Sequence, residues 1–135
     1  MTILCKTIPV YDVDVYLVTD REEGKAFIRS VSTIKGEDTN LDDCRGVCYT
    51  VTDASGGNHR LMCVFEGGAP IAIHEAVHMA WMVLKTCRVR VSQTNDEPLA
   101  YLTAYLATEM ILLIPEVDSA AGSGATNVLP ECPGA

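Results

Sequence analysis

Three residues in the middle of the chain have the types and the spacing of a metal site. His74 and His78 are four positions apart, and Glu75 directly follows the first histidine. Side chains four apart on an α-helix lie one above the other, because 3.6 residues complete a turn. Two imidazole nitrogens on one face can then bind a single ion with a carboxylate beside it. The H-E-x-x-H pattern therefore predicts a Zn2+ site in which Glu75 is the general base for a zinc-bound water.

The surrounding sequence predicts the helix that this site needs. Residues 71–84 are almost entirely apolar, contain the helix formers Ala, Met and Leu, and contain neither Gly nor Pro. Pro70 stands directly before them, where the first turn of a helix tolerates proline. The alternative interpretation makes both histidines hydrogen-bonded core residues and Glu75 a solvated one. It would have to bury two imidazoles on an apolar helix, so we favour the metal interpretation.

A second predicted helix, which starts near residue 95, offers the third ligand. Pro98 fits its first turn, and an apolar stripe at helical spacing follows, made of Leu99, Leu102, Leu106 and Met110. Glu97 stands 97 − 78 = 19 positions after His78, which leaves room for the chain to turn back across the first helix. A carboxylate ligand there would leave the fourth position of the metal for water. Asp96 competes for this role, and it is equally placed to accept a histidine N–H from outside the ligand set.

Two further side chains are candidates for a part in the site. Tyr101 stands four positions after Glu97, so the two share a helix face. Its hydroxyl could stabilise the developing oxyanion, which makes Tyr101 the second predicted catalytic residue beside Glu75. The alternative is a tyrosine that packs between helices. His59 could replace Glu97 as the third ligand, but its place beside a glycine turn favours a plain surface histidine.

The pattern of His74, Glu75, His78 and Glu97 resembles that of the gluzincin zinc metallopeptidases. Residues 97–102 (EPLAYL) are also similar to the second motif of small metallopeptidases related to phage-repressor and radiation-response regulators. They are more similar still to short H-E-x-x-H proteins encoded by tailed phages. The resemblance covers about residues 70–110 and implies a minimal zincin-like fold. It also implies a zinc site of His74, His78 and Glu97, with Glu75 as the catalytic base.

The composition limits the class of protein. A chain of 135 residues has the length of one domain, and 48% hydrophobic residues are typical of a globular one. A formal net charge of −8 argues against nucleic acid and anionic membranes as partners and is compatible with a basic peptide substrate. No apolar run reaches the length of a membrane span, and the first ten residues lack the pattern of a signal peptide. We expect a cytoplasmic protein, in the host cytoplasm if a phage encodes it.

The six cysteines do not predict disulfides, because nothing in the sequence indicates secretion. Cys63 and Cys87 stand in apolar runs and are expected to be buried thiols. Cys44 and Cys48 have a spacing that could form half of a structural zinc site, but no second Cys or His pair completes it. We favour two unrelated thiols near a turn and a strand.

The first part of the chain predicts a β-hairpin. Residues 9–18 alternate with many Val and Tyr residues, which predicts a strand, and residues 25–34 predict a second strand. The charged segment 20–24 would be the turn between them. A polar, acidic loop is expected to follow over residues 35–43.

A second hairpin is expected directly before the metal helix. Residues 46–53 and 59–66 predict two strands, and the glycines in 54–58 predict the turn between them. Residues 67–70 would end the sheet and lead into the helix of His74.

We therefore expect an α+β fold with about four mostly antiparallel strands followed by two metal-holding helices. A single zincin-like domain would occupy residues 1–115, and small residues predict a flexible tail or partner-binding arm over 116–135. The leading functional prediction is zinc-dependent hydrolysis of peptide bonds in a peptide or protein substrate. The alternatives are a non-catalytic binding protein of the same fold, which engages a host factor, and a chance motif without metal.

Overall fold

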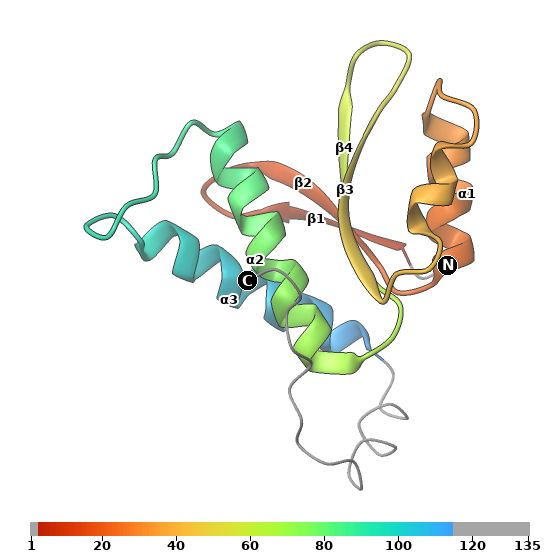
Figure 1. Cartoon of the computed structure of the whole chain (residues 1–135). Helices are drawn as coiled ribbons and strands as arrows, with labels where there is room; N and C mark the ends of the chain where they lie inside the picture. Colours follow the sequence, from red (N-terminus) through yellow and green to blue (C-terminus); the bar gives the residue numbers. More distant parts are fainter. Residues whose placement is uncertain (1–2, 115–135) are drawn as a thin grey trace, which may run out of the picture.

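The computed structural model describes residues 3–114, which form the expected α+β fold (Figure 1). The predicted tail over residues 116–135 lies outside this part of the chain. The strands are β1 (Ile3–Ile8), β2 (Val13–Val18), β3 (Gly46–Thr52) and β4 (Asn58–Val64). The helices are α1 (Arg21–Val31), α2 (Gly68–Thr86) and α3 (Glu97–Leu113), with a short 3-10 helix η1 (Glu37–Leu41).

The four strands form one mixed sheet in the order β1-β2-β4-β3. Strands β1 and β2 pair antiparallel, and so do β3 and β4, which the turn after Thr52 joins. The central pair, β2 and β4, is parallel, with Val15 opposite Arg60. Two of the three pairings are therefore antiparallel, as expected, and β3 lies at one edge of the sheet.

The prediction of a strand over residues 25–34 is wrong, because this segment belongs to α1. The side chain of Asp20 caps the helix by accepting the backbone N–H of Glu23 at 2.9 Å. Two glutamates in the first turn also favour a helix start. Ile28 and Val31, which suggested a strand, are three positions apart and fit a helix face equally well. The predicted turn over 20–24 is thus the beginning of a helix.

The partner of β2 in its hairpin is β1, which the sequence did not suggest. The pairing runs from Ile3 opposite Val18 to Ile8 opposite Val13. Residues 9–12 form the turn, and Val10 and Asp12 have positive φ there. The strand that was expected from residue 9 therefore begins only at Val13.

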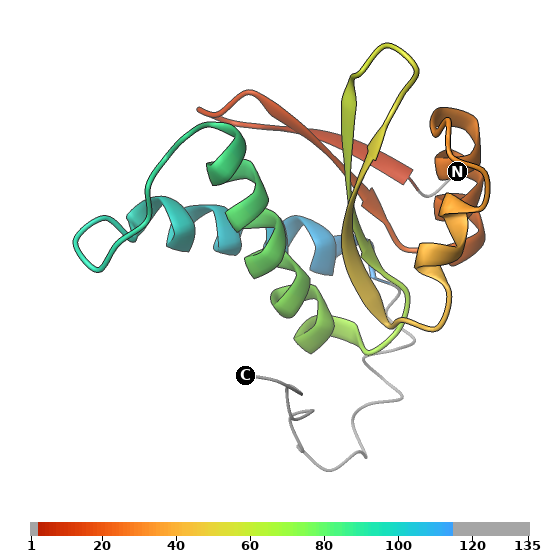
Figure 2. The same cartoon turned by 45° about the horizontal axis from the view of Figure 1, so that its top comes forward.

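Helices cover both faces of the sheet, as Figures 1 and 2 show. Alternate residues of a strand point to opposite faces. In β2, Val15 and Leu17 join the core beneath α2 and α3, whereas Val18 joins the core beneath α1 and η1. The central strand β4 divides in the same way, with Met62 on the first face and Leu61 on the second.

The two predicted C-terminal helices are confirmed, and α3 runs back across α2 (Figures 1 and 2). Pro70 and Pro98 stand in their first turns, as expected. The buried face of α2 repeats at three and four positions and consists of Ala72, Glu75, Ala76, Met79, Ala80, Val83 and Leu84. Its alanines let the two helices approach closely. Within residues 3–114, neither these helices nor α1 combine the length and apolarity needed to cross a bilayer.

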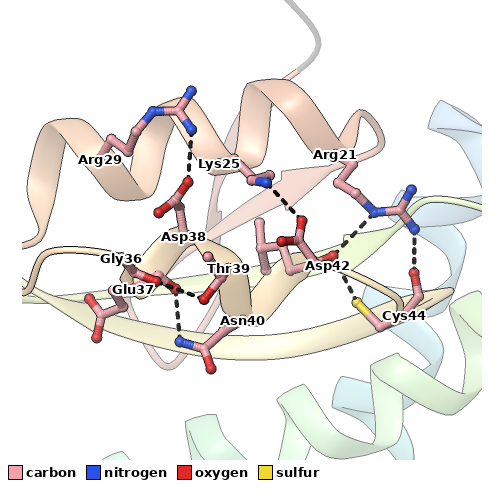
Figure 3. Close-up of polar contacts among 11 residues, drawn as sticks. Arg21, Lys25, Arg29, Gly36, Glu37, Asp38, Thr39, Asn40, Asp42 and Cys44 are labelled. Carbon is pink, nitrogen blue, oxygen red and sulfur yellow. Dashed lines mark hydrogen bonds and ion pairs between the residues drawn. The ribbon is translucent and has the colours of Figure 1, made fainter.

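The segment that leads into β3 is tied to α1 (Figure 3). Three basic residues four positions apart on α1 face this segment, namely Arg21, Lys25 and Arg29. Lys25 pairs with Asp42 at 2.7 Å, and Arg29 pairs with Asp38 at 2.8 Å. The guanidinium of Arg21 donates to the carbonyl oxygens of Leu41 and Cys44. The acidic loop expected over 35–43 therefore contains η1 and is held in place up to the start of β3.

Candidate metal site

His74 and His78 lie on the exposed face of α2, one turn apart. Their Nε2 atoms are 3.2 Å apart, and the ring planes meet at 74°. The buried residues of α2 face the sheet and α3, so both imidazoles point away from the core. The predicted convergence of the two histidines is confirmed.

The distance between the two nitrogens matches that of two ligands on one metal ion. Zn–N bonds are about 2.0–2.1 Å long, and a tetrahedral angle between them places the nitrogens about 3.3 Å apart. The observed 3.2 Å is close to this value. A shared proton between two neutral rings gives a similar distance, so the pair is arranged to hold either a proton or an ion.

Glu75 completes the group but differs from the histidines in its surroundings. The ligand atoms of Glu75, His74 and His78 all lie within 4.8 Å of one another, so the three residues could hold a metal ion. Glu75 is buried, with 4% of its surface exposed, and its Oε2 atom has no hydrogen-bond partner within residues 3–114. Burial raises the pKa of the Glu75 carboxyl, and the charges of His78 and His74 oppose this shift. A buried carboxylate oxygen without a partner is costly, and a cation beside it would remove that cost.

Strand β3 supports the turn of α2 that carries Glu75. The thiol of Cys48 donates to the backbone carbonyl of Glu75 at 3.0 Å, and the thiol of Cys44 donates to the carbonyl of Leu41 at 3.2 Å. The two thiols thus serve different contacts, in agreement with the favoured interpretation. Burial raises the pKa of both Cys48 and Cys63 well above the usual range. Cys63 is buried as expected, whereas Cys87 is half-buried.

The acidic residues at the start of α3 lie outside the metal group, which consists of His74, Glu75 and His78. Glu97 is exposed as the first residue of α3, and it is not among the residues whose ligand atoms lie within 4.8 Å of one another. Asp96, also exposed, lines the same groove as Ile73 and Val77 of α2. Tyr101 is 45% exposed and stacks on Tyr105 with ring centroids 6.4 Å apart.

His59 belongs to the hairpin of β3 and β4 and not to the metal group. Its Nε2 lies 2.8 Å from Oδ2 of Asp53, and its ring lies near those of Tyr16 and Phe27. Hydrogen bonds from Ser55, His59 and the backbone of Gly57 lower the pKa of Asp53. His59 is half-buried, so it is a structural residue of the hairpin rather than the plain surface histidine expected.

An open apolar groove lies between α2 and α3, and the sequence-based predictions did not include it. It measures about 490 Å³, and its lining is Ile73, Val77, Asp96, Leu99, Ala100, Thr103, Ala104 and Ala107. Ile73 and Val77 each directly precede one of the histidines, so the groove runs beside the metal group. The signal was present in the sequence, because Ile73, Val77 and Trp81 recur every four residues. They are exposed by 49%, 37% and 48%.

Comparisons with protein-family models, with curated protein sequences and with solved structures found no match for this chain.

Proposed function

We propose that this protein is a zinc-dependent peptidase with a minimal zincin-like fold. One observation carries the proposal: the two imidazole nitrogens have the separation of two metal ligands, and beside them lies a buried carboxylate, one of whose oxygens has no hydrogen-bond partner among residues 3–114. Metal-ligand nitrogens and a neighbouring carboxylate base are parts of the sites that hydrolyse peptide bonds with zinc.

His74 and His78 would hold the ion through Nε2. Glu97 stays the predicted third ligand, with Asp96 as its competitor, because both stand at the start of the helix that crosses α2. Zn2+ bound there would polarise the peptide carbonyl and make a water molecule more acidic. We take the metal to be zinc because two histidines and one glutamate are an established ligand set of catalytic zinc in hydrolases.

Glu75 would move the proton that hydrolysis requires. Its carboxylate takes a proton from the attacking water as the new C–O bond forms at the peptide carbonyl. The same proton then passes to the amide nitrogen as the C–N bond breaks, so the products are an amine and a carboxylic acid, which loses its own proton to water. Tyr101 is proposed to stabilise the oxyanion, and its exposed position on α3 leaves its hydroxyl accessible to a substrate.

The surroundings of the site support a peptide or protein as the substrate. The groove beside the histidines is mostly apolar and open, so it can take apolar side chains of an extended chain. The net charge of −8 favours a basic segment in that substrate. A cytoplasmic location, in the host if a phage encodes the protein, belongs to the same proposal.

The decisive experiment combines zinc content with hydrolysis of fluorescently labelled casein. Glu75→Gln keeps the size of the side chain but cannot accept a proton, so activity should fall by about 10²-fold or more while bound zinc stays unchanged. Glu109→Gln is the matched control, because Glu109 pairs with Lys6 at 3.1 Å and is not part of the metal group. Equal casein hydrolysis by wild type and Glu75→Gln would refute the proposal.

The exposed groove also favours a second candidate function, a binding protein that engages a host factor without turnover. Ile73 and Val77 line the groove and are exposed, and Trp81 is exposed four positions further along α2. Exposed apolar side chains that gather on one surface are typical of an interaction site. In this case Glu75→Gln would change neither zinc content nor binding, and wild type would bind peptides without cleaving them.

A further inference from the structure

Gly46 stands at the start of β3. Neighbouring atoms, and not the backbone conformation, exclude a larger residue there. It is not among the residues with positive φ, so another residue could adopt its backbone geometry. It faces α2, since it stands two positions before Cys48, whose thiol contacts that helix. The lack of a side chain at this position therefore needs an explanation in what lies opposite.

The explanation is the close approach of the turn that carries Glu75. A Cβ atom at position 46 would lie 2.7 Å from Cγ2 of Ile71 and 3.0 Å from Cγ of Glu75. It would also lie 2.8 Å from the carbonyl oxygen of Cys63 on β4. Real Cβ contacts shorter than 3.0 Å essentially do not occur, so Ile71 and the Cys63 carbonyl could not both stay in place beside a side chain at position 46. The Cγ atom of Glu75, at 3.0 Å, would also have to move away from β3.

A second contact fixes the same turn from the same strand. Cys48 donates its thiol hydrogen to the backbone carbonyl of Glu75. The start of β3 is itself held, because Arg21 of α1 binds the carbonyl of Cys44, two residues before Gly46 (Figure 3). Glu75 thus lies against the end of a strand that is held by other contacts. His74 and His78, in contrast, project from the exposed face of the helix.

We propose that Gly46 is a positioning residue that sets the place of the Glu75 carboxylate relative to the imidazole pair. This inference rests on the proposed function, in which Glu75 moves the proton. It predicts that a change at Gly46 alters the position of the base without altering the metal ligands, because the atoms nearest to a side chain there belong to Ile71, Cys63 and Glu75 and not to the histidines.

Gly46→Ala in the full-length protein tests this separation. Affinity for Zn2+, measured by competition with a chromophoric chelator, should stay within about threefold of wild type, because both imidazoles are untouched. The kcat for fluorescently labelled casein should fall by about 10²-fold with little change in KM, the effect of a catalytic group displaced by about 1 Å. A loss of zinc that parallels the loss of activity would overturn the proposal, and so would an unchanged kcat.

Gly24→Ala is the matched control for damage to the core. A Cβ at Gly24 would lie 2.9 Å from Cδ1 of Leu41 and 3.1 Å from Cγ1 of Val18, in the core beneath α1. This variant should be destabilised but retain the wild-type kcat. The same fall in kcat in both variants would overturn the proposal. If Gly46→Ala does not fold, Cys48→Ala replaces it, since it removes the contact to Glu75 without adding atoms, and a kcat equal to that of wild type would then refute the role of β3.

A crystal structure of Gly46→Ala distinguishes this inference from the proposed function itself. The Glu75 carboxylate should be displaced while the two Nε2 atoms keep their separation of 3.2 Å. If wild type binds zinc but cleaves no casein, the peptidase proposal fails, and the displacement still decides whether Gly46 places Glu75. An undisplaced Glu75 in that structure overturns the inference.

Discussion

The Nε2 atoms of His74 and His78 lie 3.2 Å apart on successive turns of α2. A single metal ion bound by both nitrogens would fit this separation, because two Zn–N bonds of about 2.0–2.1 Å at a tetrahedral angle place the nitrogens about 3.3 Å apart. The same ion would give the buried carboxylate of Glu75 a counter-charge, since the ligand atoms of the three residues lie within 4.8 Å of one another.

We expect protein purified without added metal to contain close to one zinc per chain, measured by plasma mass spectrometry. His78→Ala should lose it, because one imidazole and a water bind zinc far more weakly than two imidazoles. His59→Ala removes the same side chain from the hairpin, where Asp53 holds it, and should keep the metal. A metal-free wild type, even after zinc is offered, would contradict both the site and the proposed function.

Substitutions can distinguish the roles of the two acidic residues at the start of α3. Glu97→Ala should weaken zinc binding by more than about 100-fold if Glu97 is a ligand, whereas Asp96→Ala should cost at most about 10-fold to 100-fold as a supporting residue. Chelator competition on both variants gives the comparison. A larger loss of zinc affinity in Asp96→Ala than in Glu97→Ala would assign the ligand role to Asp96. If both variants bind zinc as tightly as wild type, the third ligand comes from outside the start of α3.

Arg21 should contribute much more to stability than Lys25, although both bridge α1 to the segment before β3. Arg21 donates to two backbone carbonyls and lies over the ring of Phe65, with Cζ 4.8 Å from the centroid. Arg21→Ala is expected to lower the free energy of unfolding by about 1–3 kcal/mol, because two partly buried carbonyls lose a charged donor. Lys25→Ala should cost less than about 1 kcal/mol, as for other surface ion pairs. Urea unfolding of both variants checks the ranking, and equal midpoints would contradict it.

The β3–β4 hairpin should loosen in acid because of Asp53. Its pKa is lowered in the folded protein, so its stabilising contribution is complete above the unfolded value of about 3.9 and is lost as the pH falls below it. Amide exchange of Ser55 and Gly57, whose N–H groups donate to Asp53, should quicken below that pH relative to the intrinsic rate. Asp53→Asn should abolish this pH dependence, and an equally steep dependence in the variant would exclude Asp53 as its origin.

The thiols of Cys48 and Cys63 in the sheet should react slowly with alkylating reagents in the folded protein. Burial raises the pKa of Cys48 and Cys63, so little thiolate forms at pH 8. Both should resist iodoacetamide in the folded protein and react once urea is added, as mass spectrometry of digested protein can show. Rapid labelling of Cys48 in the folded state would mean that β3 separates from α2 in solution.

Local sequence determined the elements whose signals lie within one helix or hairpin. The spacing of His74 and His78 requires only that α2 be a helix, and an apolar run after Pro70 ensures this. The hairpin of β3 and β4 and the start of α3 at Glu97 were predictable for the same reason, since glycine and proline mark their ends. The strand prediction over residues 25–34 was wrong because their apolar residues fit a strand and a helix alike. The helix cap at Asp20 favours the helix.

Only the tertiary structure decided which side of the metal helix each residue occupies. Helical spacing places Glu75 near the histidines, but the packing of α2 against the sheet buries Glu75 and leaves the histidines exposed. The need for glycine at position 46 likewise arises from a contact between segments almost 30 residues apart, 75 − 46 = 29, which no local pattern encodes. Spacing along one helix is set by bond geometry, whereas burial depends on what the rest of the chain brings against that helix.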